Sequence, residues 1–146
     1  RLNRGMAATC PRNRFVTLFY GVIDPKSGEL AWCNAGHNPP LLVRAEGEIV
    51  PLDGGGPVLG VVPTMRYEER RGAMESGDVL LLYSDGVAEA CNPDGVEFSQ
   101  RLNTLLLEKR GETAAGIGQA VHEAVRAWTE GLPPADDVTV VAARRC

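Results

Sequence analysis

Two acidic segments stand at the ends of apolar runs that are typical of buried strands. Asp85-Gly86 follows one such run, and Asp136-Asp137 precedes another. A carboxylate in this position is held by a rigid scaffold yet stays at the surface, and Gly86 lets the backbone turn sharply beside it. If the two strands are neighbours, Asp85 and Asp136 converge at one end of a sheet.

Two carboxylates brought that close repel each other unless a cation lies between them. Ligation by carboxylates alone suits hard ions such as Mg²⁺ or Mn²⁺, and two such ions can activate a water for in-line attack on a phosphate. Asp-Gly is also a common turn pair, and Asp136 follows a proline-rich loop where polar residues are expected. Spacing alone therefore leaves both a metal site and two ordinary surface turns open.

The composition is that of an ordinary globular protein, because 44% of the 146 residues are hydrophobic and 23% are charged. This length predicts a single domain over residues 1–146. A net charge of −4 argues against a nucleic-acid-binding face. The four cysteines form no C-x-x-C pair, which excludes common zinc and redox motifs. We see no signal peptide and no apolar run approaching about 18 residues, so we expect no membrane span and a cytoplasmic location.

The elements that must position the acidic segments can be read from periodicity and turn chemistry. Two hairpins are predicted, over 15–35 around Asp24–Gly28 and over 41–52 around Glu46-Gly47. Residues 54–57 are expected to form a flexible loop without regular structure. Further strands are predicted at three places: a polar edge strand over 65–73, a strand over 78–83 buried on both faces, and a buried strand over 138–142.

Three helical segments complete the pattern, at residues 1–9, after Ser99 and after Thr113. The second carries its leucines on one stripe, and the third repeats apolar residues at a spacing of 3.6. Several strands, two helices and a last strand indicate an α+β fold with antiparallel pairing, in which the helices cover one sheet face.

An ordered set of motifs resembles the PPM metal-dependent serine/threonine protein phosphatases, in their SpoIIE/RsbU-like bacterial branch. The resemblance covers essentially the whole chain. The matching segments are F-V-T-L-F-Y-G at 15–21, N-A-G-H-N-P-P at 34–40, Gly60, Gly77-Asp78, Y-S-D-G-V-A-E-A at 83–90, N-P-D-G at 92–95 and D-D-V-T at 136–139.

The resemblance implies an α-β-β-α sandwich of antiparallel sheets and a centre of two Mn²⁺ or Mg²⁺ ions. It implies hydrolysis of phosphoserine or phosphothreonine on a protein by a metal-bridged water. By the family pattern, Asp85 and Asp136 bind metal. Gly86 and Asp137 then bind or support the centre, and Glu89 matches a position linked to a third, weaker metal.

Two features qualify that expectation. The family's first metal motif, a G-D-x-x-G-like segment, lies upstream of the strand at 15–21, so we expect a catalytic domain truncated at its N-terminus. We expect such a fragment to bind metal weakly and to have little catalytic turnover. Gly36 and His37 stand in the A-G-H-x-P turn, where ordering of a loop near the site is favoured over a general-acid role for the histidine.

The resemblance further implies a substrate of the phosphorylated anti-sigma-factor-antagonist type and control by an upstream sensory domain. A homodimer is compatible with the sequence, and a nucleic-acid partner is not expected. Two alternatives stay open. One is a catalytically inactive truncated domain that serves as a protein-binding or oligomerisation module. The other is a metal hydrolase of small phosphoesters, which the ordered motif set disfavours.

Overall fold

The computed structural model describes residues 1–11, 13–132 and 136–146. These residues form two compact units. Unit 1 contains Arg1–Pro39 and Leu52–Ala73, and unit 2 contains Pro40–Pro51 and Met74–Cys146. Each unit has its own four-stranded sheet. The single domain expected over 1–146 stays a prediction.

Unit 1 is built around one central strand. Strand β2 pairs antiparallel with β1 and β6 and parallel with the two-residue strand β5. The elements of the unit are α1 (Leu2–Thr9), β1 (Leu18–Ile23), β2 (Glu29–Ala35), β5 (Gly55–Gly56) and β6 (Arg70–Ala73).

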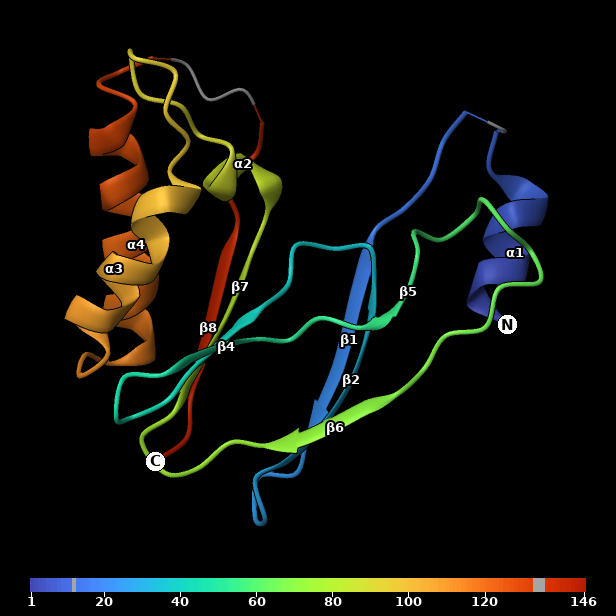
Figure 1. Cartoon of the computed structure of the whole chain (residues 1–146), viewed down its shortest axis with the longest axis horizontal. Helices are drawn as coiled ribbons and strands as arrows, with labels where there is room; N and C mark the ends of the chain where they lie inside the picture. Colours follow the sequence, from blue (N-terminus) through green and yellow to red (C-terminus); the bar gives the residue numbers. More distant parts are fainter. Residues whose placement is uncertain (12, 133–135) are drawn as a thin grey trace. The chain divides into compact units, whose positions relative to one another are not determined.

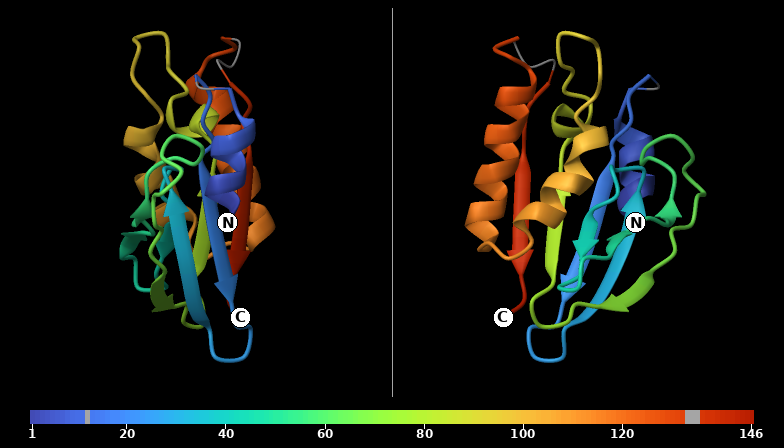
Figure 2. Two further views of the ribbon diagram at one scale, coloured as in Figure 1. Left: turned by 90° about the vertical axis from the view of Figure 1, so that its right-hand side faces the viewer. Right: turned by 60° about the vertical axis from the view of Figure 1, so that its left-hand side comes forward.

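The first predicted hairpin is present, and its turn is closed by local chemistry. The Asp24 carboxylate accepts hydrogen bonds from the Lys26 and Ser27 N–H groups at 2.7 and 3.0 Å. Gly28 follows with φ of 79°, a conformation that favours glycine. Figure 2 shows this turn joining the two long strands β1 and β2.

Two predictions in unit 1 need correction. Residues 54–57 are not wholly irregular, because Gly55 pairs with Asn34 in a short parallel ladder. A Cβ at Gly55 would lie 2.6 Å from the Asn34 nitrogen, so only glycine lets the two main chains approach. The polar strand expected over 65–73 is confined to Arg70–Ala73.

Unit 2 carries the acidic segments. Its sheet has the order β4-β3-β7-β8, with every neighbouring pair antiparallel. Figure 1 shows α3 and α4 lying together beside this sheet. The elements are β3 (Leu41–Val43), β4 (Ile49–Pro51), β7 (Val79–Tyr83), α2 (Asp85–Ala88), α3 (Ser99–Lys109), α4 (Ala114–Trp128) and β8 (Val140–Arg144).

The core of unit 2 forms between one sheet face and the apolar stripes of the two long helices. Alternate strand residues such as Val79 and Leu81 belong to one buried cluster with Leu102 of α3 and Val121 of α4. Helix α4 begins as predicted, because the Thr113 hydroxyl accepts a hydrogen bond from the Gly116 N–H at 3.1 Å. The helices therefore hold β7 rigidly from one side.

The last strand differs from its prediction in position and burial. It begins at Val140 rather than at residue 138. In the part of the chain that the structure describes, β8 is an edge strand, paired on one side with β7 only, and Val141 is 54% exposed. A run of apolar residues thus marks the strand but does not show that both of its faces are covered.

Among the residues that the structure describes, no helix is long and apolar enough to cross a lipid bilayer. The longest of them, α4, has 15 residues.

Candidate metal centre

Strands β7 and β8 are neighbours, which is what convergence of the two acidic segments requires. They pair antiparallel, with Tyr83 opposite Val140. The end of β7 and the start of β8 therefore lie at the same end of the sheet. Asp85 follows β7 by two residues, and Asp136 precedes β8 by four. Figure 1 shows α2 beside the segment that enters β8.

Ser84 ties the two segments together. Its hydroxyl donates to the Asp137 carbonyl at 2.6 Å and accepts from the Thr139 N–H at 3.0 Å. Its own N–H donates to the Thr139 carbonyl at 3.0 Å. Sequence reasoning missed this role, because a serine at a strand end gives no sign of a partner more than 50 residues away. The only available signal was its place in the matched Y-S-D-G motif.

Gly86 allows the main chains of the two segments to touch. A Cβ at this buried position would overlap the Asp137 carbonyl oxygen and would lie 3.0 Å from the Asp136 carbonyl oxygen. The glycine is not needed for an unusual φ, since Gly86 has no positive φ and lies in α2. Its value is close approach, which corrects the expectation of a sharp turn.

The two predicted ligands share one local arrangement. Asp85 and Asp136 are both exposed, and one carboxylate oxygen of each accepts a hydrogen bond from the following N–H, at 3.0 and 2.7 Å. Their second carboxylate oxygens have no hydrogen-bond partner within the described part of the chain. Solvent-facing carboxylate oxygens of this kind are the donors that hard divalent ions prefer.

A hollow of about 860 Å³ adjoins these segments. Gly86, Glu89, Asp136 and Asp137 contribute to its lining, whereas Asp85 does not. Glu89 is exposed, and its backbone N–H caps α2 by donating to the Asp85 carbonyl at 2.8 Å. Within residues 1–11, 13–132 and 136–146, no group of three His, Cys, Asp or Glu side chains is arranged to hold a metal ion. The described carboxylates therefore offer suitable donors but not a complete ligand set.

The A-G-H-x-P turn lies in unit 1, and Asn34 orders it. The buried Asn34 amide donates to the His37 carbonyl at 2.9 Å and accepts from the His37 N–H at 2.8 Å. The His37 ring nitrogen Nδ1 lies 3.2 Å from the Thr17 hydroxyl. Gly36 has φ of 73°, and a Cβ there would collide with Val58. The histidine thus belongs to a hydrogen-bonded loop, and its role near the site stays a prediction.

The chain matches a protein family over its full length. The model of the family described as Stage II sporulation protein E (SpoIIE) matches residues 1–146. Protein IcfG of Synechocystis is 30% identical over 131 residues, which cover 90% of this chain. Phosphoserine phosphatase RsbU of Bacillus subtilis is 25% identical over 145 residues, or 99% of this chain. The chain spans only 21% of IcfG and 43% of RsbU.

Solved structures confirm the predicted fold class. The SiaA-PP2C domain of Pseudomonas aeruginosa superposes with a TM-score of 0.84 at 17% identity, covering 97% of this chain and 57% of that one. The RsbU and RsbW domains of a Mycobacterium tuberculosis protein give a TM-score of 0.76 at 26% identity, covering 97% and 39%. The α+β arrangement is therefore that of PP2C, or PPM, phosphatase domains. With a family model that matches every residue and a fold that agrees with it, this chain belongs to the SpoIIE family, in the SpoIIE/RsbU-like branch of the PPM phosphatases.

Proposed function

We propose that this chain forms part of a metal-dependent phosphoserine/phosphothreonine protein phosphatase. The observation that carries the proposal is the junction of β7 and β8. There Ser84 and Gly86 hold the Asp136-Asp137 main chain against the segment that carries Asp85. Two exposed carboxylates, far apart in sequence, are thereby anchored to one rigid sheet end.

Asp85 and Asp136 would hold Mn²⁺ or Mg²⁺, two ions being expected in the complete centre. Their all-oxygen donor chemistry fits a hard ion. When bound, such ions would neutralise phosphate charge and lower the pKa of a coordinated water, which supplies the nucleophile. Asp137 and Gly86 support the ligands through their main chains, and Glu89 is a candidate for a weaker, additional ion.

The protein's own residues would keep the ligands in place during turnover. Ser84 fixes the Asp137 carbonyl and the Thr139 N–H at the same time, so the loop that carries Asp136 cannot move away from β7 without breaking both bonds. Rigid placement of this kind matters because loss of an interaction that supports a metal ligand typically costs about 10–100-fold in metal affinity or activity.

For the substrate we propose a phosphorylated anti-sigma-factor antagonist. The proposal is supported by likeness to an RsbU that is named a phosphoserine phosphatase. It is also supported by the M. tuberculosis protein in which RsbU and RsbW domains occur together. Control by a sensory domain, a homodimer and a cytoplasmic location belong to the same proposal.

The test is Mn²⁺-dependent phosphate release from a phosphoserine protein by the full-length protein. We expect Asp85→Asn and Asp136→Asn each to remove the release, because each would lose a metal ligand. Asp53→Asn makes the same chemical change at an exposed aspartate of unit 1, outside the candidate site, and should leave the rate unchanged. Undiminished release by Asp85→Asn would refute the proposal.

A second candidate function is a binding or oligomerisation module without catalysis. It is favoured by the observation that the described residues contain no cluster of three metal ligands. In that case the full-length protein would bind a partner equally well with and without Mn²⁺ and would release no phosphate. Release that depends on Asp85 would exclude this candidate.

A further inference from the structure

The hollow beside the candidate centre has features that the metal site does not use. Its volume of about 860 Å³ is within the size range of protein ligand pockets. Apolar side chains form much of its wall, including Val125 of α4, Ala90 after α2 and Val138 before β8. All three belong to unit 2, the same unit as Asp85 and Asp136.

Helix α4 adds one permanent positive charge, that of Arg126, to this wall. His122 and Arg126 both line the hollow and lie four residues apart, so they project from the same helix face. Within the described part of the chain, the Arg126 guanidinium makes no hydrogen bond or ion pair. The neighbouring Glu123, by contrast, accepts a hydrogen bond from the Gln119 amide at 2.8 Å. Arg126 therefore offers an uncommitted, permanent positive charge.

The charges of the hollow are distributed unevenly. Glu89, Asp136 and Asp137 belong to the segments that adjoin the proposed metal ions, which would offset their charge. Arg126 belongs to the helix instead, and so does Glu123, which also lines the hollow but accepts the Gln119 amide hydrogen bond. With metal bound, Arg126 would be the position on the helix that attracts an acidic group, while the apolar part of the wall would accept a hydrophobic one.

We propose that this hollow holds the residues that flank the phosphoserine of a phosphoprotein substrate, an apolar side chain inside and an acidic side chain at Arg126. The inference rests on the proposed phosphatase function. A phosphoserine that reaches the metal site must lay its neighbouring residues on the adjoining surface, because an extended chain advances only about 3.3 Å per residue. The hollow shares Gly86, Asp136 and Asp137 with that site, so it is continuous with it.

The experiment uses two phosphoserine peptides of equal length and the full-length protein. One peptide carries Asp and Leu on both sides of the phosphoserine, and the other carries Lys and Ser. Each peptide carries a non-hydrolysable phosphonate in place of the phosphate, so fluorescence anisotropy in Mn²⁺ measures affinity without turnover. We expect the wild-type protein to prefer the acidic, apolar peptide by about three- to tenfold, the range of one charge-assisted contact at a partly exposed site.

Substitutions of exposed lining residues assign that preference to the hollow. Arg126→Gln should abolish most of it, and Arg126→Glu should reverse it in favour of the Lys peptide. Leu132→Ser, at a lining residue that is 48% exposed, should weaken binding of the Leu-containing peptide without a change in charge. Arg101→Gln on α3 removes the same charge from an exposed residue outside the hollow and should leave the preference intact.

The outcomes separate this inference from the function on which it rests. A preference that survives both Arg126 substitutions, or no binding of either peptide by the wild-type protein, would overturn the docking inference. If Asp85→Asn still removes phosphate release in that case, the phosphatase proposal stands. A charge-dependent preference in a protein that releases no phosphate would keep the docking surface and refute the phosphatase.

Discussion

Strand β7 has an aspartate near each end, and the two lie in opposite environments. Asp78 precedes the strand and is only 1% exposed, whereas Asp85 follows it and is exposed. Asp78 is saturated with hydrogen bonds. Within the described part of the chain, the Asp85 carboxylate accepts one hydrogen bond, from the N–H of the next residue. The same residue type therefore occurs in two contrasting environments at the ends of one strand, which differ in burial and hydrogen bonding.

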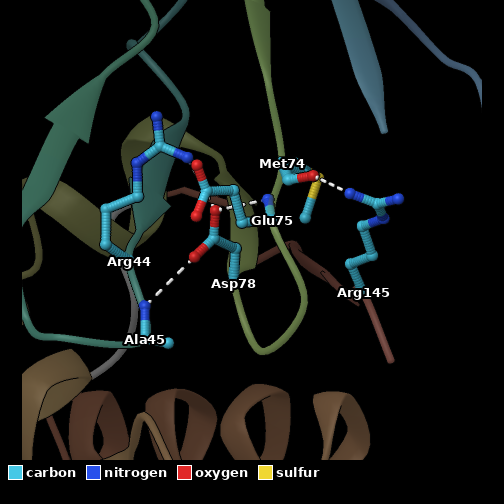
Figure 3. Close-up of polar contacts among 6 residues, drawn as sticks. All are labelled: Arg44, Ala45, Met74, Glu75, Asp78 and Arg145. Atoms are coloured by element: carbon cyan, nitrogen blue, oxygen red, sulfur yellow. Dashed lines mark hydrogen bonds and ion pairs between the residues drawn. The ribbon is translucent and has the colours of Figure 1, made fainter. Parts of the chain in front are cut away.

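The Asp78 carboxylate organises the turns at its end of the sheet, as Figure 3 shows. One oxygen accepts from the Arg44 guanidinium at 2.7 Å and from the Glu75 N–H at 2.8 Å, and the other accepts from the Ala45 N–H at 3.1 Å. Arg145 adds main-chain bonds beside it, with its N–H donating to the Asp78 carbonyl at 3.0 Å. Burial alone would raise the pKa of Asp78, but these hydrogen bonds outweigh burial and lower the pKa below its ordinary value.

The comparison teaches how to separate structural from functional carboxylates in this fold. A buried carboxylate whose oxygens are all engaged by the protein has no capacity left for a ligand. An exposed carboxylate on an anchored backbone, with one oxygen uncommitted, retains that capacity. Asp78 and Gly77 belong to the matched motif set as much as Asp85 does, so motif membership alone does not assign the role.

The largest expected effect is on stability at the Asp78 end. Asp78→Asn should lower the free energy of unfolding by about 2–3 kcal/mol, because the buried amide NH₂ that replaces one carboxylate oxygen cannot accept a hydrogen bond and the ion pair with the partly exposed Arg44 is lost. Asp85→Asn should change it by less than about 0.5 kcal/mol, as is usual at exposed positions. Urea denaturation of both variants without metal measures the difference. Equal losses of unfolding free energy in the two variants would contradict the distinction between Asp78 and Asp85.

Gly86→Ala should damage the Asp85 end through packing rather than charge. The added methyl would overlap the Asp137 carbonyl, which belongs to the backbone and cannot rotate away. We expect a loss of about 2 kcal/mol in stability, in the range for overpacked sites, together with weaker Mn²⁺ binding. Gly118→Ala, on α4 where an added Cβ meets nothing within 4 Å, is the matched control and should not destabilise the protein. Unchanged Mn²⁺ affinity in Gly86→Ala would show that the metal ligands do not depend on the close contact between Gly86 and the Asp137 carbonyl.

Ser84→Ala should have a smaller effect of the same kind. It removes one donor and one acceptor that join β7 to the segment before β8. The expected loss is about 1 kcal/mol, the net value of an ordinary hydrogen bond. Ser99→Ala, which removes an exposed hydroxyl that donates to the Glu97 carboxylate at 3.2 Å, should cost less. A Mn²⁺ affinity, measured by calorimetry, that falls with Ser84→Ala but not with Ser99→Ala would show that Ser84 positions the ligands. Equal Mn²⁺ affinities of the two variants would contradict that role.

The smallest effect is the pH dependence of the Asp78 contribution. A carboxyl whose pKa is lower in the folded state stabilises the protein fully above its unfolded pKa, near 4, and loses this contribution as pH falls through the folded pKa. The stability difference between the wild-type protein and Asp78→Asn should therefore be constant from neutral pH to about pH 4 and shrink below it. Urea midpoints over that range test this. A stability difference that grows as the pH falls would contradict a lowered pKa of Asp78 in the folded state.

Local chemistry was readable from the sequence, and contacts between distant segments were not. The turn at Asp24–Gly28 and the Thr113 cap follow from residues within a few positions of each other, and both are present. The pairing of Gly55 with Asn34 depends on the approach of two main-chain segments that are 21 residues apart, and no side-chain pattern indicates it. The exposure of Val141 has the same origin, because Val140 and Ala142 on either side of it pack against the core and Val141 projects from the opposite sheet face.

The candidate site shows the same division. The sequence could propose that Asp85 and Asp136 meet, because apolar runs predicted the strands that carry them, and those strands are neighbours. It could not reveal that Ser84 bonds the Asp137 and Thr139 main chain, nor that Arg126 lines the adjoining hollow. The first fact depends on how the segment after β7 meets the segment before β8, and the second depends on which face of α4 lines the hollow. Packing of the whole unit determines both.

The central claim is that Asp85 and Asp136 bind the same metal ion, and a double-mutant cycle on Mn²⁺ affinity tests it most directly. Calorimetric titration would compare the wild-type protein with Asp85→Asn, Asp136→Asn and the double variant. If one ion needs both carboxylates, each single substitution should weaken binding by at least about tenfold, and the double variant should lose little more than either single one. Losses that multiply in the double variant, or a single substitution without effect, would show that the two carboxylates do not share an ion.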